Sequence, residues 1–421
     1  MTPSPIEVSL EEAAALVKSG DHVVVGCLAA EPIGLVRAVC GRAHELRDVT
    51  ITAGVLLDGY PVLDAPEESF RFRTWLMPTS SSHRVDPSRV SFMPFSWSQA
   101  VDWLRRIKID VAIVQVAPGP DGNYSLGTSV SYGRVAVDHA ETVIGVVNPL
   151  MPYTFGDSVI PASALDVIVH DEAELPVLTN RPAGPRDRAL AMSVAETIPD
   201  GALLQVGVGV LPDAVIAGLV DLGRRNLRQF SMLTDSFLEL VKHRALTDEG
   251  PQAIVGEIVG SSALYDYVRE NRRVTMADGR RTHAMKGLLE RKGLVVLGSA
   301  LEVDLLGQAN LEVRGGAQFS GVGGAMDFGV AAATSQATAD SVIMLHSATA
   351  DGTSRIVPRL SGGMVSLPRT LVRRVVTEHG AAVLDSASAR ERAERLVAVA
   401  DPAHRDELAR HLRANPALFG A

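Results

Sequence analysis

Short runs of apolar, β-branched residues alternate with helical segments along most of this 421-residue chain, and no other feature constrains the fold as strongly. In the first half we expect buried strands at residues 21–26, 49–53, 110–116 and 142–147. Continuous apolar strands of this kind are typical of parallel sheets that are covered by helices on both faces. The sequence therefore predicts an α/β fold.

The intervening helices of the first half carry recognisable start signals. A helix is expected at residues 10–18, where Ser9 is a plausible N-cap and Glu12 completes a capping box. A second helix is expected at residues 32–46, with proline at its first position.

The same alternation restarts after a polar, proline-rich stretch at residues 172–188, which we interpret as a linker. The elements expected beyond it are helices at 189–198, 212–222, 389–399 and 405–413, and strands at 202–206, 293–297 and 341–345. A chain of this length is too long for one ordinary core. We predict two open α/β domains of similar design, residues 1–180 and 181–421.

Composition excludes several classes of function. The net charge of −9 and the pI near 5.7 argue against a nucleic-acid partner, which needs a basic face. The sequence contains no run of 18 apolar residues, so we expect no membrane span. Residues 1–5 do not have the pattern of a secretory signal, and we therefore expect a cytoplasmic protein. Two cysteines, Cys27 and Cys40, are too few for a disulfide framework or a zinc cluster, and no metal site is expected.

Two glycine-rich loops in the second half indicate a ligand. The first runs through Gly207, Val208, Gly209, Val210 and Leu211, and the second covers residues 319–328. Such loops let backbone N–H groups approach an anionic or thioester ligand closely. Neither loop has the spacing of a dinucleotide fingerprint, and each alone is more typical of a tight turn. Together they predict one ligand held from two sides.

Several ordered motifs resemble one known family. They lie at residues 115–118, 121–127, 147–152, 207–215, 302–310, 319–328 and 354–358. Together they resemble the acetyl-CoA hydrolase/transferase family, and in particular 4-hydroxybutyrate or acetate CoA-transferases, over residues 8–412. The resemblance implies two open α/β domains with the active site in the cleft between them, CoA thioester substrates, no bound cofactor, and a homodimer or larger homo-oligomer. It also implies ping-pong chemistry in which a glutamate attacks the thioester and the glycine loops stabilise the oxyanions.

The chain departs from this family at the nucleophile. The family carries a run of the type His-Thr-Glu-Met-x-Ser-Asp-Gly, whereas residues 229–236 here read Gln-Phe-Ser-Met-Leu-Thr-Asp-Ser. Met232 and Asp235 fix the register, so Ser231 stands where the glutamate is expected. A serine cannot form the acyl–glutamyl anhydride, and it forms an ester only if a base takes its proton. Ser231 is therefore either a space-filling residue or a different nucleophile.

Two further departures concern the ligand. Gly321, Gly323 and Gly324 are followed by Ala325, where the family has glutamine, and the turn at residues 335–340 lacks the lysine expected to meet a CoA phosphate. The missing cation makes a carrier-protein phosphopantetheine an alternative to CoA, because phosphopantetheine has no adenosine phosphates.

Other side chains are candidates for catalysis or binding. Glu31, Glu257 and Glu302 are carboxylates that could replace the missing glutamate, and each has a plainer interpretation as a solvated or capping group. Glu239 lies two helical turns beyond Ser231 and is expected to face elsewhere. By resemblance, Glu31 is placed with the catalytic residues and Glu302 with the CoA-binding ones.

A histidine is the remaining catalytic candidate. His346 follows an expected strand and is either a base near neutral pH or a hydrogen-bonded loop residue.

Three hypotheses about function follow. The first is an enzyme that transfers or hydrolyses the acyl group of acyl-CoA or of an acyl carrier protein without a glutamyl-CoA intermediate. The second is an active CoA-transferase that uses another carboxylate, and the third is a non-catalytic acyl-CoA-binding or partner subunit.

Overall fold

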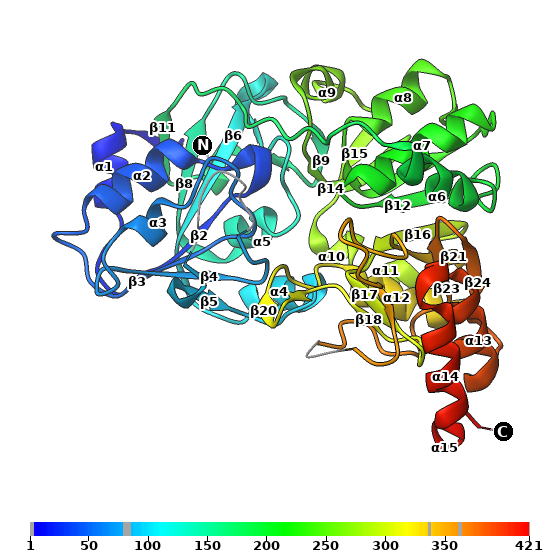
Figure 1. Cartoon of the computed structure of the whole chain (residues 1–421). Coiled ribbons are helices and arrows are strands. Elements are labelled where there is room, and N and C mark those ends of the chain that lie inside the picture. The colour runs from blue at the N-terminus through cyan, green and yellow to red at the C-terminus, as the bar shows by residue number, and fades with distance from the viewer. Residues whose placement is uncertain (1–3, 79–85, 336–337, 361–363, 421) are drawn as a thin grey trace. The chain divides into compact units, whose positions relative to one another are not determined.

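The computed structural model describes residues 4–78, 86–335, 338–360 and 364–420, and the chain divides into two compact units (Figure 1). Unit 1 comprises residues 1–179, 231–234 and 253–284, and unit 2 comprises residues 180–230, 235–252 and 285–421. The break after residue 179 falls within the proline-rich stretch. Unit 1 also takes in two segments from the half of the chain that we assigned to the second domain. The expectation that residues 1–5 form no secretory signal falls partly on residues 1–3, which lie outside the described residues.

The main sheet of unit 1 has the strand order β1-β11-β8-β6-β2-β3-β4-β5, and neighbouring strands in this path are parallel. Its strands are β1 (Ile6–Glu7), β2 (His22–Val25), β3 (Val49–Thr52), β4 (Phe70–Thr74), β5 (Val90–Phe92), β6 (Ile109–Pro118), β8 (Ala140–Val147) and β11 (Val167–His170). Two short antiparallel strands, β7 (Tyr124–Ser125) and β10 (Val159–Ile160), extend from the end of β6.

Both faces of this sheet are buried, as the continuous apolar runs predict. Val23 and Ile113 belong to one core, which also contains apolar residues of α1 (Leu10–Ala15) and α2 (Ile33–Gly41). Val24 and Ala112 point to the opposite face and are also fully buried. The remaining helices of the first 179 residues are α3 (Pro61–Asp64), α4 (Trp97–Leu104) and α5 (Gly133–His139), and α5 packs against β6 and β8.

The segment 253–284 of unit 1 forms a small parallel ladder with strand β9 of the first segment. It has the order β14-β15-β9, with β9 (Phe155–Gly156), β14 (Ala253–Ile258) and β15 (Val274–Met276). Two helices, α9 (Ser262–Val268) and α10 (Gly279–Thr282), complete the unit. Backbone bonds join this ladder to the loop before α5, because Val130 N–H donates to Gly256 O at 2.9 Å and Ile258 N–H donates to Thr128 O at 2.8 Å.

The sheet of unit 2 has the order β24-β23-β21-β16-β12-β13, and all its pairs are parallel except β23 with β24. Its strands are β12 (Leu203–Val206), β13 (Arg228–Leu233, of which residues 231–233 are counted with unit 1), β16 (Leu294–Ser299), β21 (Thr338–Met344), β23 (Arg374–Thr377) and β24 (Gly380–Val383). A three-stranded sheet, β18 (Ala309–Asn310), β17 (Glu302–Asp304) and β22 (Ile356–Val357), and a hairpin, β19 (Val313–Arg314) and β20 (Ala317–Gln318), are added to it.

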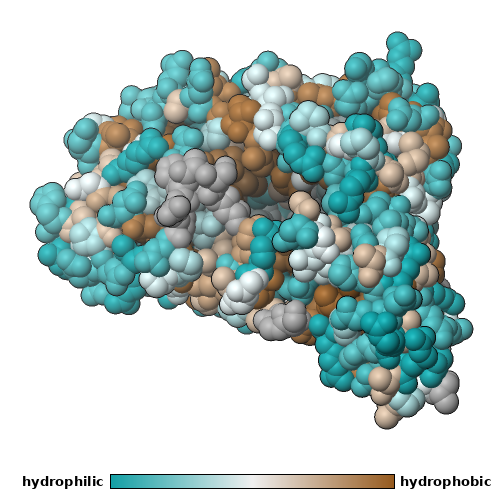
Figure 2. All heavy atoms as spheres, viewed as in Figure 1, coloured by the Kyte–Doolittle hydropathy of each residue, from teal (hydrophilic) through white to brown (hydrophobic). Residues whose placement is uncertain are grey.

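Helices cover the sheet of unit 2. They are α6 (Pro185–Ala195), α7 (Val210–Asp221), α8 (Ser236–Lys242), α11 (Met285–Leu289), α12 (Ala325–Thr334), α13 (Ala389–Val399), α14 (Arg405–Ala414) and α15 (Pro416–Phe419). Leu396 of α13 and Leu412 of α14 lie in a core with Val375 of β23. The outer side of α14 is hydrophilic (Figure 2). No helix in the described parts of the chain is long and apolar enough to cross a membrane.

Most expected elements exist, and the differences lie at their ends. The capping box of Ser9 and Glu12 is present, and α13 has the predicted bounds. Helix α2 ends at Gly41, five residues before the predicted end. Helix α6 begins at Pro185, four residues before the predicted start, because Asp187 accepts the Gly184 N–H at 2.7 Å and stabilises an earlier first turn.

We predict that Gly156→Ala destabilises unit 1. Gly156 has φ +105°, and a Cβ there would lie 2.2 Å from Met276 O of the paired strand. The left-handed backbone costs about 1 kcal/mol and the clash about 2 kcal/mol more, so the denaturation midpoint falls clearly. Gly20→Ala is the matched control, because Gly20 has φ +87° but nothing within 4 Å of its added Cβ. Equal losses in urea titrations of the two variants would contradict this account.

Candidate functional site

Both glycine loops and His346 lie at one edge of the unit 2 sheet. The first loop follows β12 and His346 follows β21, so both are at carboxyl ends of parallel strands. Helix α12 packs against β21, and only a few residues separate the end of α12 from the start of β21. The helix therefore runs antiparallel to this strand. The first residues of α12 therefore lie at the same edge, where ligands of open α/β sheets bind.

The first glycine loop presents the N-terminus of a twelve-residue helix. Gly209 has φ 145° and is the N-cap of α7, which begins at Val210 rather than at Pro212 as predicted. Val208 is 43% exposed at the tip of the loop. The first N–H groups of a helix have no intrahelical partner, and they carry a partial positive charge. This loop can therefore stabilise an anion or a polarised thioester oxygen.

The second glycine loop has the same design. Gly323 has φ 54°, Gly324 is the N-cap of α12, and Ala325 is the first residue of that helix. Gly321, Gly323, Gly324 and Ala325 are all partly exposed. The loop therefore brings open backbone to the sheet edge, and Ala325 adds no polar side chain there.

The turn after α12 contains no cation among its described residues. Gln336 and Ala337 lie outside the described residues. Asp340, the acid of this turn, is held by Arg374 of β23 at 3.1 Å.

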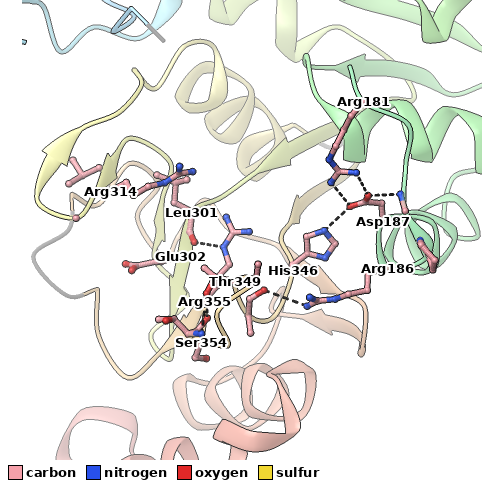
Figure 3. Close-up of a pocket in the computed structure, with 17 residues that line it drawn as sticks. Arg181, Arg186, Asp187, Leu301, Glu302, Arg314, His346, Thr349, Ser354 and Arg355 are labelled. Atoms are coloured by element: carbon pink, nitrogen blue, oxygen red, sulfur yellow. Dashed lines mark hydrogen bonds and ion pairs between the residues drawn. The ribbon is translucent and has the colours of Figure 1, made fainter. Parts of the chain in front are cut away.

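A pocket of about 700 Å³ opens within unit 2 (Figure 3). Its lining comes from residues 181–187, 301–302, 313–315 and 346–355. Glu302 of β17 is part of the lining, and its buried Oε2 has no hydrogen-bond partner among the described residues. Arg355 lies beside it, because Val303 N–H donates to Arg355 O at 2.9 Å. The sequence motifs at residues 302–310 and 354–358 contain Glu302 and Arg355, but they did not predict that the two residues line one pocket.

His346 lines the same pocket between two carboxylates. Its Nε2 lies 2.8 Å from Asp187 Oδ1, and its Nδ1 lies 3.8 Å from Glu378 Oε2, an ion-pair distance. Glu378, helped by Asp187, raises the pKa of His346 although burial opposes this shift. Arg181 binds Asp187 at 2.8 Å, and Arg186 forms an ion pair with Glu378. Both ring nitrogens of His346 face carboxylates, so the geometry favours a structural role for this residue.

Ser231 has an unusual backbone conformation. It lies within β13 with φ 77°, in the left-handed region that non-glycine residues rarely adopt, and it is 7% exposed. Two residues on, Leu233 O accepts the Val259 N–H at 3.0 Å, so this part of β13 adjoins the end of β14 within unit 1. The residue type gave no signal of this strain.

A buried polar cluster in unit 1 surrounds the end of β14. Glu257 is 4% exposed, and burial raises its pKa to about 8, although Ser129 and the Ser131 backbone favour the ionised form. Ser129 is bridged to Glu257 through the backbone, and its Oγ lies 3.5 Å from Cys27 Sγ. Burial, with the nearby Glu257, raises the pKa of the Cys27 thiol well above 9. Burial also raises the pKa of Cys40, to about 12.

Glu31 lies in the connection between β2 and α2 and is 1% exposed. Its two carboxylate oxygens accept the N–H groups of Leu57 at 2.6 Å and Asp58 at 2.7 Å. Burial raises the pKa of Glu31 to about 8 despite these two bonds. In this structure its carboxylate connects two loops. Glu239, in contrast, is exposed on α8 and lies near Lys242 and His243.

No group of three or more His, Cys, Asp and Glu side chains among the described residues is arranged to hold a metal ion.

Comparison with known proteins shows to which family this chain is related. The profile of the acetyl-CoA hydrolase/transferase N-terminal domain matches residues 7–179, and that of the C-terminal domain matches residues 260–412. The chain is 32% identical to the 4-hydroxybutyrate coenzyme A transferase of Clostridium kluyveri, over 95% of this chain and 96% of that protein. It is 33% identical to the succinyl-CoA:cyclohexane-1-carboxylate CoA transferase of Geobacter metallireducens, over 94% and 92%.

Solved structures agree with these sequence matches. The structure of RipA from Yersinia pestis superposes with a TM-score of 0.89 at 27% identity, over 97% of both chains. A 4-hydroxybutyrate CoA-transferase from Porphyromonas gingivalis gives a TM-score of 0.79 at 27% identity, over 97% of this chain and 98% of that one. The chain belongs to the acetyl-CoA hydrolase/transferase family.

Proposed function

We propose that this chain is an enzyme that transfers or hydrolyses the acyl group of a thioester without forming a glutamyl-CoA intermediate. Relatives that match most of its length are named CoA-transferases, and others that match parts of it are named acetyl-CoA hydrolases. Both names describe reactions of CoA thioesters. Acyl-CoA is therefore the first substrate to test, and an acyl carrier protein is the second.

The observation that supports this proposal most directly is the residue type and backbone conformation at position 231. A side-chain-bearing residue at φ 77° inside a strand costs roughly 1–2 kcal/mol, and such strain is typical of functional sites. By resemblance this is the position of the family's nucleophile. A serine has no carboxylate, so it cannot form the anhydride, and because its side chain is shorter than that of glutamate it leaves space for a water molecule or an acceptor. We assign Ser231 a space-filling role at this position rather than the role of nucleophile.

The carboxylates of unit 1 are poorly suited to replace the missing nucleophile. Both oxygens of Glu31 are engaged by backbone N–H groups. Glu257 is fully buried, and with a pKa of about 8 most of it is protonated at neutral pH. A carboxylic acid that is protonated and shielded from solvent does not attack a thioester. This argument disfavours a glutamyl-CoA intermediate on either residue.

The glycine loops supply what the remaining chemistry needs. Attack of water or an acceptor on a thioester builds negative charge on the carbonyl oxygen, and N–H groups at the first turns of α7 and α12 can stabilise it. Glu302 remains a rival nucleophile, because it lines the pocket of unit 2 and its Oε2 has no hydrogen-bond partner among the described residues. That rival would make the chain a CoA-transferase that uses a displaced carboxylate. A non-catalytic subunit is the third possibility to test.

We expect no CoA adduct on the native chain and one on Ser231→Glu. Each protein is incubated with acetyl-CoA and then with borohydride, which reduces a glutamyl-CoA thioester to an alcohol and releases CoA, and the residue that carries the alcohol is mapped by mass spectrometry. The new glutamate restores the family's nucleophile, so CoA exchange into free acetate should appear with it. A CoA thioester on any glutamate of the native chain would contradict the proposal.

Ser231→Ala is the control for the role of the hydroxyl. If Ser231 only fills space, thioester turnover changes less than about fivefold, whereas loss of a nucleophile costs about a thousandfold or more. Absence of CoA release for a panel of acyl-CoA and acyl-carrier substrates would favour the non-catalytic alternative.

We also predict that Glu257 makes stability fall as pH rises. Its pKa is raised from 4.5 to about 8, so the folded state binds more protons than the unfolded state between these values. The stabilisation is fully present below pH 4.5 and is lost as pH rises through 8. Glu257→Gln should flatten this part of the curve of denaturation midpoint against pH and leave thioester turnover measurable. A curve with the native slope would show that Glu257 is ionised in the folded state.

A further inference from the structure

The pocket of unit 2 contains two arginines, Arg314 and Arg355, that form no direct ion pair with a carboxylate among the described residues. Of its four arginines, Arg181 is paired with Asp187 and Arg186 with Glu378. Arg314 and Arg355 have no ion pair with any of the described residues. Their positions on the opposite side of the pocket from Asp187 are visible in Figure 3.

Both arginines are held in place by uncharged groups. Arg355 Nε and Nη2 donate to Leu301 O and Ala300 O, each at 2.8 Å, which leaves Nη1 available. The guanidinium of Arg314 lies 4.0 Å from the centroid of the Phe319 ring. Burial together with the repulsion from Arg314 lowers the pKa of Arg355, although the charges of Glu302 and Glu378 oppose this shift. An anion between them would relieve this repulsion.

Glu302, which lies beside Arg355, adds a second requirement for a ligand of this pocket. Glu302 Oε2 is buried without a partner among the described residues, and a buried acceptor left in this state costs about 1–3 kcal/mol. A hydroxyl or amine of a ligand would satisfy it. The volume of about 700 Å³ suits a small molecule rather than a single ion.

We propose that this pocket binds a molecule whose carboxylate or phosphate contacts Arg314 and Arg355 and whose hydrogen-bond donor contacts Glu302. Thr349 and Ser354 also line the pocket. The residues that line this pocket belong to unit 2, and Ser231 is counted with unit 1. The proposal concerns binding alone, so it stands or fails independently of the reaction at Ser231.

The test is isothermal titration of the full chain with four probes: CoA, dephospho-CoA, 4-hydroxybutyrate and butyrate. Arg314→Gln should weaken binding of the anion about tenfold, because Arg314 is exposed and lies on a short hairpin that tolerates the change. Arg410→Gln, an exposed arginine of α14 that does not line the pocket, is the control and should bind like the native chain.

The probes identify the source of the anion. A preference for CoA over dephospho-CoA that disappears in Arg314→Gln identifies a nucleotide phosphate, and weaker binding of both acids in that variant identifies a carboxylate. Glu302→Ala should remove any preference for 4-hydroxybutyrate over butyrate. Unchanged affinity of Arg314→Gln for every probe would overturn the proposal, and circular dichroism checks that each variant is folded.

Discussion

Parallel hydrogen bonding of the central strands is the constraint on which the rest of the structure depends. Parallel neighbours need crossover connections, and these connections are helices that bury both faces of the sheet. The same geometry places every carboxyl end at one edge. In unit 2 this edge receives the loop before α7, the loop before α12 and His346. The parallel strands therefore bring His346, which lines the pocket, to the same edge as the two glycine loops.

The fold was largely predictable because burial on both faces leaves a clear record in the sequence. Strands β2, β3, β6, β8, β12, β16 and β21 are all short, mostly apolar runs, and each was expected close to its observed position. Strand β4, with the alternating sequence Phe-Arg-Phe-Arg-Thr, was not predicted, and neither were the largely apolar strands β11, β13, β14 and β23. The segments 231–234 and 253–284 could not be assigned to unit 1 from sequence, because their placement depends on contacts between distant residues.

The site was less predictable because its geometry depends on distant partners. Glycine spacing located both loops, and the structure places each at a helix N-terminus. His346 was found by its position after a strand, but its partner Asp187 lies 159 residues earlier and no local pattern connects them. Serine occurs in every kind of backbone, so nothing in the sequence indicated that Ser231 is left-handed. The charge balance of the pocket likewise required coordinates, because it depends on which arginines already have partners.

The burial of both cysteines has a practical consequence for enzymology. Cys27 and Cys40 are the chain's only thiols, both are buried, and burial raises the pKa of each. Disulfide reagents react with thiolates, so the folded protein should contribute little background colour to an assay that detects liberated coenzyme thiol. Continuous optical recording of turnover is therefore feasible at high enzyme concentration. A slow rise in colour without substrate would instead report the opening of unit 1, where both thiols lie.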